Sequence, residues 1–235
     1  EKPLTTNSTH AKKLYELSRK SKNNVFVVMQ NRFNKPIIAL KEILNKEKLG
    51  KVFLTSVRVR WSRNEKYYNL AKWRGTKKDD GGVLFNQAAH HVDMMTYLNG
   101  PIKKVKAFKN NYIVKNIDHE DTIVATVEFK NGSIGSLEVT VATRPNDLEG
   151  SISVLGSKGA VEISGFSMDE IKHWNFYKKY KKPLIKSHNH IYGIGHVQLY
   201  REIFKAIRNE KNIAPTVKDG YENVKLIEKI YKSTK

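Results

Sequence analysis

The segment from residue 103 to residue 179 contains a succession of short alternating runs, and this feature constrains the fold more than any other. Polar and apolar residues alternate there with the period of a strand that has one face covered. Asn131-Gly132 is a strong hairpin signal between two of the runs, and Ser157-Lys158-Gly159 forms a turn between two others. The predicted strands are 103–110, 121–129, 133–143, 151–156, 160–165 and 170–179. Because strands joined by short turns pair antiparallel, these residues predict a large, mostly antiparallel sheet.

The rest of the chain has mainly helical periodicity. Thr5, Thr6 and Ser8 can each cap the first helix. A strand is expected at 52–61, where Val57 and Val59 alternate with two arginines. Helices are expected at about 7–21, 36–48, 196–209 and 219–233, with a further one from Gly81-Gly82 to Asn99. The fold class is therefore α+β, with helices on one face of the sheet.

The apolar run VFVVM at 25–29 is typical of a strand that is buried on both faces in a parallel sheet. With the helix before it, residues 1–34 are interpreted as an α/β remnant, the last helix and strand of a doubly wound domain. Residues 35–235 are interpreted as the α+β domain. Since a strand end falls at Glu1 with no strand before it, we expect the chain to be the later part of a longer protein.

The charge of the chain allows two interpretations. Lys and Arg number 43 against 23 Asp and Glu, a net charge of +20, which could indicate nucleic-acid binding. The lysines are spread along the chain, however, and neither helix-turn-helix nor zinc-finger spacing occurs. The basic balance could instead attract an anionic small substrate or cofactor. No apolar run long enough for a membrane span, no signal peptide and no cysteine are found, so a cytoplasmic protein without disulfides is expected.

The stretch DDGGVLFNQAAHHVD, residues 79–93, gathers the polar residues that can carry chemistry. In a single helix, Asn86, His90 and Asp93 would share one face. His91 would point about 100° away from His90, so the two histidines could not easily share a metal ion. No His-Glu-x-x-His motif is present, and no metal is expected. The alternative to a functional site is a buried His90 that is bonded to Asn86 or Asp93.

Several motifs in the same order resemble the Gfo/Idh/MocA family of NAD(P)-dependent oxidoreductases. Glu1-Lys2-Pro3 is similar to the EKP motif of the family, and residues 81–93 are similar to its glycine-histidine motif, with His90 at the catalytic histidine. Further similarities lie at 30–33 (QNRF), 73–76 (WRGT) and 148–165. Asn86, where many members carry Asp, and GIGH at 193–196 are most like the branch that oxidises UDP-N-acetyl-glucosaminuronate at C3.

The resemblance implies a fold and a site. Residues 1–34 would belong to the dinucleotide-binding domain. Residues 35–235 would form a glyceraldehyde-3-phosphate-dehydrogenase-like substrate-binding domain that forms homo-oligomers through its sheet. The implied catalytic residues are Lys2 and His90. NAD, or alternatively NADP, would lie along Glu1, Lys2, Asn31, Trp73 and Arg74, and a nucleotide-sugar substrate would contact Arg60, Asn86, His90 and His196.

These residue types suit the oxidation of a secondary alcohol. A histidine accepts a proton near neutral pH, and a lysine ammonium stabilises a developing alkoxide. Asn86 cannot raise the basicity of His90 as a carboxylate would, so we assign it to substrate positioning. The glycine-rich dinucleotide loop would precede Glu1, and we expect this chain alone to bind NAD poorly and to be inactive.

Two other classes of function stay open at this point. The chain could be a catalytically inactive sugar-binding or scaffold oligomer, or a basic nucleic-acid-binding protein. Arg60 could face solvent on its strand, Trp73 could pack in the core, and His196 could cap a helix. His188 and His190 are interpreted as ordinary loop residues.

Overall fold

In a computed structural model that describes residues 1–185 and 194–234, one seven-stranded sheet forms the centre of the molecule. The strand order is β2-β3-β4-β1-β5-β6-β7, and every neighbouring pair is antiparallel except β1 and β4. The predicted mostly antiparallel sheet is thereby confirmed. The strands are β1 (Val52–Arg60), β2 (Ile102–Asn110), β3 (Thr122–Phe129), β4 (Ile134–Thr140), β5 (Glu149–Gly156), β6 (Gly159–Ser164) and β7 (Glu170–Phe176).

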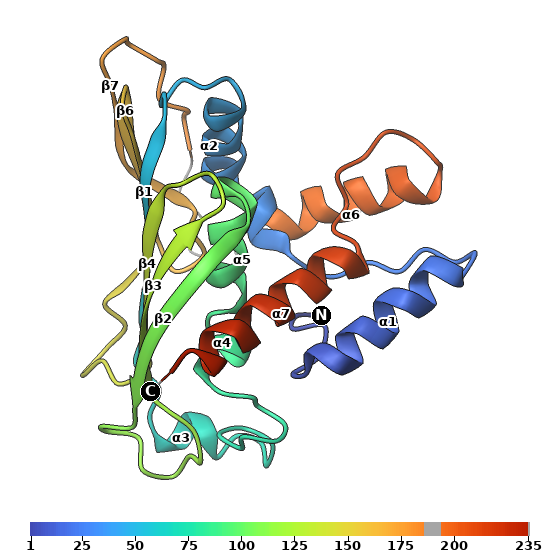
Figure 1. Cartoon of the computed structure of the whole chain (residues 1–235), viewed down its shortest axis with the longest axis vertical. Coiled ribbons are helices and arrows are strands. Elements are labelled where there is room, and N and C mark those ends of the chain that lie inside the picture. The colour runs from blue at the N-terminus through green and yellow to red at the C-terminus, as the bar shows by residue number, and fades with distance from the viewer. Residues whose placement is uncertain (186–193, 235) are drawn as a thin grey trace.

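The helices gather on one face of this sheet (Figure 1). They are α1 (Ser8–Lys20), α2 (Lys35–Asn45), α3 (Glu65–Tyr68), α4 (Val83–Asn86), α5 (Ala89–Asn99), α6 (Gly195–Ile207) and α7 (Val217–Lys232), with a 3₁₀ turn η1 (Gln30–Phe33). Helix α5 packs on β1, α7 on β2, and α1 on α7. None of the described helices is both long enough and apolar enough to cross a membrane. The expected α+β fold with helices on one face is confirmed.

The two faces of β1 differ, and this alternation orients the sheet. Val57 and Val59 are fully buried in the core beneath the helices. Arg58 and Arg60 point to the opposite face, which the helices leave uncovered. We call this opposite face the outer sheet face. Side chains that lie on it are therefore separated from the helices by the sheet itself.

The cap of α1 differs from the expected one. Asn7 caps the helix, since its Oδ1 accepts hydrogen bonds from the backbone N–H groups of Thr9 and His10 at 2.8 and 3.1 Å. Ser8 instead donates its hydroxyl to Glu228 Oε2 at 2.7 Å and its backbone N–H to the same carboxylate. Because Glu228 belongs to α7, this pair of bonds fastens the start of α1 to α7.

The strand predicted at 25–29 is wrong. Only Phe26 makes a bridge, to Thr216, and the N–H of Val27 donates to the carbonyl of Pro215 at 3.1 Å. A strand needs a ladder partner along its length, and this run makes no further bridge to the described residues. The run nevertheless alternates in burial: Val27 and Met29 are almost fully buried, whereas Val25 is 47% exposed.

The single helix predicted from Gly81-Gly82 to Asn99 is also wrong, because it is split into α4 and α5 at Gln87 and Ala88. The start of α4 is bonded to two distant segments: Val83 N–H donates to Glu120 Oε1, just before β3, at 3.1 Å, and Leu84 N–H donates to the Tyr231 hydroxyl of α7 at 3.2 Å. At the break, the buried Gln87 side chain donates to the Tyr67 hydroxyl at 2.6 Å. These tertiary bonds fix a turn at the point where helix periodicity alone predicts continuation.

Candidate active site

The segment that holds Asn86 and His90 is met by three others that are far from it in the sequence. They are the N-terminal segment with Lys2, η1 with Gln30, and the first turn of α6 with His196. The Lys2 ammonium donates a hydrogen bond to the backbone carbonyl of Asn86. Lys2 and His196 are both close enough to lower the pKa of His90 electrostatically. The structure thus brings together both expected catalytic residues and two of the expected substrate-binding residues.

Gly195 allows the first turn of α6 to come this close. A Cβ atom at this position would lie 2.1 Å from the carbonyl oxygen of Gln30 and 2.8 Å from Asn34 Oδ1. Only a residue without a side chain can therefore bring α6 into contact with η1 here. His196 follows directly, so its place beside His90 depends on the glycine before it.

The side-chain partner of His90 is Gln30, not Asn86 or Asp93 as the buried-histidine alternative would have it. Gln30 Nε2 lies 3.1 Å from His90 Nε2, and Gln30 is almost fully buried. An amide N–H that donates to this nitrogen requires its lone pair, so the imidazole is neutral in this arrangement. Burial, followed by the charge of Lys2, lowers the pKa of His90 well below its usual value. The Nε2 lone pair can accept a proton from a ligand once a ligand hydroxyl takes the place of the Gln30 amide.

The ammonium of Lys2 has a perturbed affinity for its proton. Burial lowers its pKa from 10.5 to about 8, against the opposing attraction of Glu1 and Asp80. Lys2 is therefore mainly charged at neutral pH and yet only about one unit from losing its proton. This is the range in which a lysine can stabilise a negative oxygen and also exchange a proton with it.

Asp93 and Arg32 form a buried ion pair that holds the site together. Arg32 donates to both Asp93 oxygens, at 2.6 and 2.7 Å, and to Asp219 Oδ1 at 2.8 Å. These bonds tie η1 to α5 and α7. Burial raises the pKa of Asp93 more than Arg32 lowers it, while the two carboxylates raise the pKa of Arg32 despite its burial. Asp93 therefore positions η1, and with it Gln30, and does not orient the His90 ring.

Asp80 belongs to the site although the sequence analysis did not single it out. It is almost fully buried, and its Oδ2 accepts hydrogen bonds from Asn86 Nδ2 at 3.0 Å and from the backbone N–H of Gly75 at 2.7 Å. An Asp directly before a Gly-Gly pair is a common surface turn signal, which concealed its burial. Gln30 and Arg32 were missed for a different reason, because they follow a run that was interpreted as a strand.

The residues expected along a cofactor lie on two sides of this centre. Asn31 is buried in η1 next to Gln30, and Glu1 is exposed beside Lys2. The Arg74 guanidinium lies over the rings of Tyr67 and Trp73, at 4.4 and 4.6 Å from their centroids, and donates to the Tyr67 hydroxyl. Among the described residues no carboxylate forms an ion pair with Arg74, so this cation is held rigidly and is free to bind an anion.

Arg60 lies apart from the reacting groups, whereas His91 borders them from within the core. Arg60 donates to Glu138 at 2.5 and 2.8 Å and to Glu149 at 3.2 Å on the outer sheet face, so the sheet separates it from His90. His91 is buried edge-on against Trp61, and burial lowers its pKa to about 3. His188 and His190 lie outside the described residues. In the described part of the chain, no group of three or more potential metal ligands comes together.

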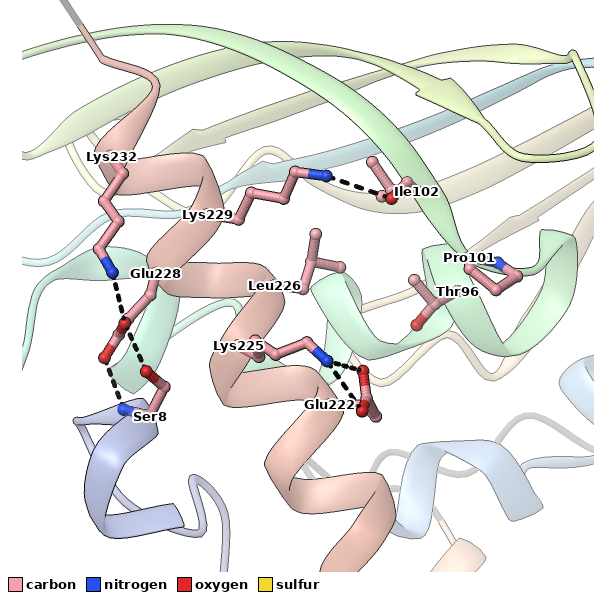
Figure 2. Close-up of a pocket in the computed structure, with 10 residues that line it drawn as sticks. All are labelled: Ser8, Thr96, Pro101, Ile102, Glu222, Lys225, Leu226, Glu228, Lys229 and Lys232. Atoms are coloured by element: carbon pink, nitrogen blue, oxygen red, sulfur yellow. Dashed lines mark hydrogen bonds and ion pairs between the residues drawn. The ribbon is translucent and has the colours of Figure 1, made fainter. Parts of the chain in front are cut away.

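A cavity in the described part of the chain lies away from this centre. It measures about 550 Å³ and is lined by residues of α7, α5 and the start of β2, together with Ser8 of α1 (Figure 2). Two of its lysines form ion pairs, Lys225 with Glu222 and Lys232 with Glu228, and Lys229 donates to the backbone carbonyls of Ile102 and Lys103. Because its lining holds no histidine, the residues suited to proton transfer are those around His90.

The comparisons with known proteins agree with the family resemblance. Residues 41–235 match the C-terminal alpha/beta domain of the Gfo/Idh/MocA oxidoreductase family. The chain therefore belongs to the Gfo/Idh/MocA family of oxidoreductases.

Three similar proteins illustrate the relationship. The WlbA dehydrogenase from Bordetella pertussis, in complex with NADH and UDP-GlcNAcA, is 31% identical with a TM-score of 0.87, over 99% of this chain and 67% of that one. The WlbA dehydrogenase from Chromobacterium violaceum, with the same two ligands, is 34% identical with a TM-score of 0.87, over 98% and 66%. The levoglucosan dehydrogenase of Pseudarthrobacter phenanthrenivorans is 24% identical over 94% of this chain and 67% of its own length. The chain thus spans about two thirds of the length of these relatives.

Proposed function

We propose that this chain carries the substrate side of an NAD(H)-dependent dehydrogenase that acts on a secondary alcohol of a nucleotide sugar, a UDP-N-acetyl-hexuronate oxidised at C3. The observation that carries the proposal is the convergence of Lys2, Asn86 and His90 from two segments that are far apart in the sequence. This convergence places a proton acceptor, a cation and a neutral amide together, which is what the removal of a proton from an alcohol requires.

Each of these groups has a separate role in the proposed reaction. The substrate hydroxyl takes the place of the Gln30 amide at His90 Nε2, and the neutral imidazole accepts the hydroxyl proton there. The Lys2 ammonium stabilises the negative charge that develops on the same oxygen. The Asn86 amide is oriented by Asp80 and positions the sugar through hydrogen bonds. The dinucleotide, when bound, supplies the nicotinamide that takes the hydride from carbon.

The residues around Gln30 and Lys2 fit a dinucleotide. Gln30 Oε1 is buried and has no partner among the described residues, so a donor group of a ligand could satisfy it. Glu1, Lys2 and Asn31 adjoin it, and we assign Trp73 and Arg74 to the same cofactor. NAD is favoured because the WlbA and levoglucosan dehydrogenase structures contain NADH.

Two observations support a nucleotide sugar over a simple sugar. The WlbA dehydrogenases, whose structures hold UDP-GlcNAcA, are 31–34% identical to this chain, whereas the levoglucosan dehydrogenases are 19–24% identical. The net charge of +20 also favours an anionic ligand. We assign His196 to this substrate together with Asn86 and His90. We leave Arg60 out of the assignment because two glutamates already bind it.

We further propose that the outer sheet face forms a homo-oligomer interface. Ser56 and Ser136 bond to each other across β1 and β4 at 3.0 Å, and an Arg–Glu network lies beside them. Such a flat face with small side chains can be covered by a second copy of itself.

Isothermal titration calorimetry of the chain with UDP-N-acetyl-glucosaminuronate, and separately with levoglucosan, tests the proposal. We expect binding of the UDP-sugar, with an affinity at least 10-fold lower for His90→Ala and for Asn86→Ala. Binding that is equal in both variants would leave a scaffold function as the better interpretation. Preferential binding of levoglucosan would contradict the nucleotide-sugar assignment. A nucleic-acid affinity that falls steeply with salt, without competition by the sugar, would contradict the whole proposal.

A further inference from the structure

Further buried titratable groups lie next to Lys2 and Asn86. Its centre is Asp80, which is 3% exposed although it carries a carboxylate. One oxygen accepts two hydrogen bonds, from Gly75 N–H and Asn86 Nδ2, while the other oxygen is buried without a partner among the described residues. A buried carboxylate is costly unless it is paired, so its position here calls for a charge partner.

Lys2 is the cation on the side of the substrate. Its ammonium donates to the backbone carbonyl of Asn86, and the side chain of the same Asn86 donates to Asp80. Asp80 also attracts the Lys2 ammonium directly and opposes the effect of burial on it. Asn86 carries no charge of its own. Two carboxylates therefore favour the charged form of Lys2: the exposed Glu1 and the buried Asp80, which precedes Asn86 by six positions.

His119 lies on the far side of Asp80. Its Nδ1 is 2.7 Å from the carbonyl oxygen of Glu120, and its Nε2 is 3.9 Å from Asp80 Oδ2. Although burial lowers the pKa of His119, its contacts with Asp80 and Glu120 raise it more, and the net direction is upward. Tyr68 and Tyr231 are the other titratable groups that sense the charge of Asp80. Asp80 is thus placed between the Lys2 ammonium and the His119 imidazole, and only Lys2 belongs to the reacting centre.

We propose that Asp80 is a positioning residue of this site, which orients the Asn86 amide and holds Lys2 in its charged form, with His119 balancing the same carboxylate from behind. The proposal rests on the proposed function for its catalytic meaning, because it explains how a neutral Asn86 can support a dehydrogenase centre. Its physical content is a coupling between three side chains, which can be measured without any ligand.

The experiment is a pH titration of the full chain by NMR, in which the 13Cε resonance of Lys2 is followed. We expect the midpoint of Lys2 to fall by about one pH unit in Asp80→Asn, as is typical for the loss of a nearby opposite charge. Asp79→Asn is the matched control, because this neighbouring carboxylate is exposed. In this variant the midpoint of Lys2 should equal that in the unchanged chain. Asp80→Glu keeps the negative charge, so the midpoint of Lys2 should return most of the way to its value in the unchanged chain. A merely structural role of Asp80 would not produce this return.

Equal Lys2 midpoints in Asp80→Asn and Asp79→Asn would overturn the proposal. Should Asp80→Asn fail to fold, the reciprocal measurement decides. The 13Cγ resonance of Asp80 should show an inflection at the midpoint of Lys2, and this inflection should vanish in Lys2→Gln. An inflection that persists there would likewise overturn the coupling. Because no sugar or dinucleotide is present, the result is independent of the calorimetric test of function.

Discussion

The Arg32–Asp93 pair offers the sharpest test of how the site is held together. Asp93→Asn removes the carboxylate that accepts two hydrogen bonds from Arg32 at 2.6 and 2.7 Å. The side chains of Arg32 and Asp93 are only 11% and 3% exposed, so water cannot replace the lost partner. The bond from Arg32 to Asp219 remains, and it compensates in part for the loss.

The expected magnitude follows from the burial of the pair. Removing one partner of a buried ion pair usually costs about 3–5 kcal/mol, because the other charge remains buried without its counter-ion. Since Asp219 stays in place, we expect a loss near the lower end, about 3 kcal/mol in the free energy of unfolding. Glu222→Gln is the control: it breaks an ion pair with Lys225 whose side chains are 52% exposed, and it should cost only about 0.5 kcal/mol.

The assay is urea unfolding followed by circular dichroism. With a slope of about 2 kcal/mol per molar urea, Asp93→Asn should lower the midpoint by about 1.5 M, against about 0.25 M for Glu222→Gln. The NMR signals of Gln30 should shift in the same variant, because Arg32 positions η1. A midpoint that falls no further than in Glu222→Gln would refute the reasoning that this pair holds η1 in place.

Three further outcomes are expected. Gly195→Ala should destabilise the chain by about 1–3 kcal/mol in urea unfolding, because its Cβ meets the carbonyl oxygen of Gln30, whereas Val197→Ala on the exposed side of α6 should change little. The raised pKa of His119 makes its contribution to stability complete below about pH 6.5 and lost as the pH rises through the raised value. The difference in urea midpoint between the unchanged chain and His119→Gln should therefore shrink between pH 6 and pH 9, and a constant difference would contradict this sign. Arg60→Ala should leave calorimetric UDP-sugar affinity unchanged, in contrast to Asn86→Ala, since the sheet separates Arg60 from His90.

The sheet could be predicted from the sequence because its signal is local. Alternation along each strand and the Asn131-Gly132 turn depend on neighbouring residues, and the turn is present with a positive φ at Gly132. The run at 25–29 shows the limit of such signals. Its composition is that of a strand, but strand formation depends on a partner elsewhere, and only Thr216 bridges it.

The site could be predicted only in part, for a related reason. The places of Lys2 and His90 follow from motifs that lie in order along the chain. The partners of these residues are long-range: Gln30 lies 60 residues from His90, and Arg32 lies 61 residues from Asp93. Helix periodicity could not reveal that Gln87 binds Tyr67 and that the helix is interrupted there.

The central claim is that a nucleotide sugar binds where Lys2 and His90 converge, and an NMR titration tests it most directly. UDP-N-acetyl-glucosaminuronate is added to the chain while the His90 ring nitrogens and Lys2 13Cε are observed, with the exposed His173 of β7 as the control. We predict saturable shifts at His90 and Lys2 and none at His173. Binding that leaves His90 and Lys2 unchanged, or no binding at all, would contradict the account.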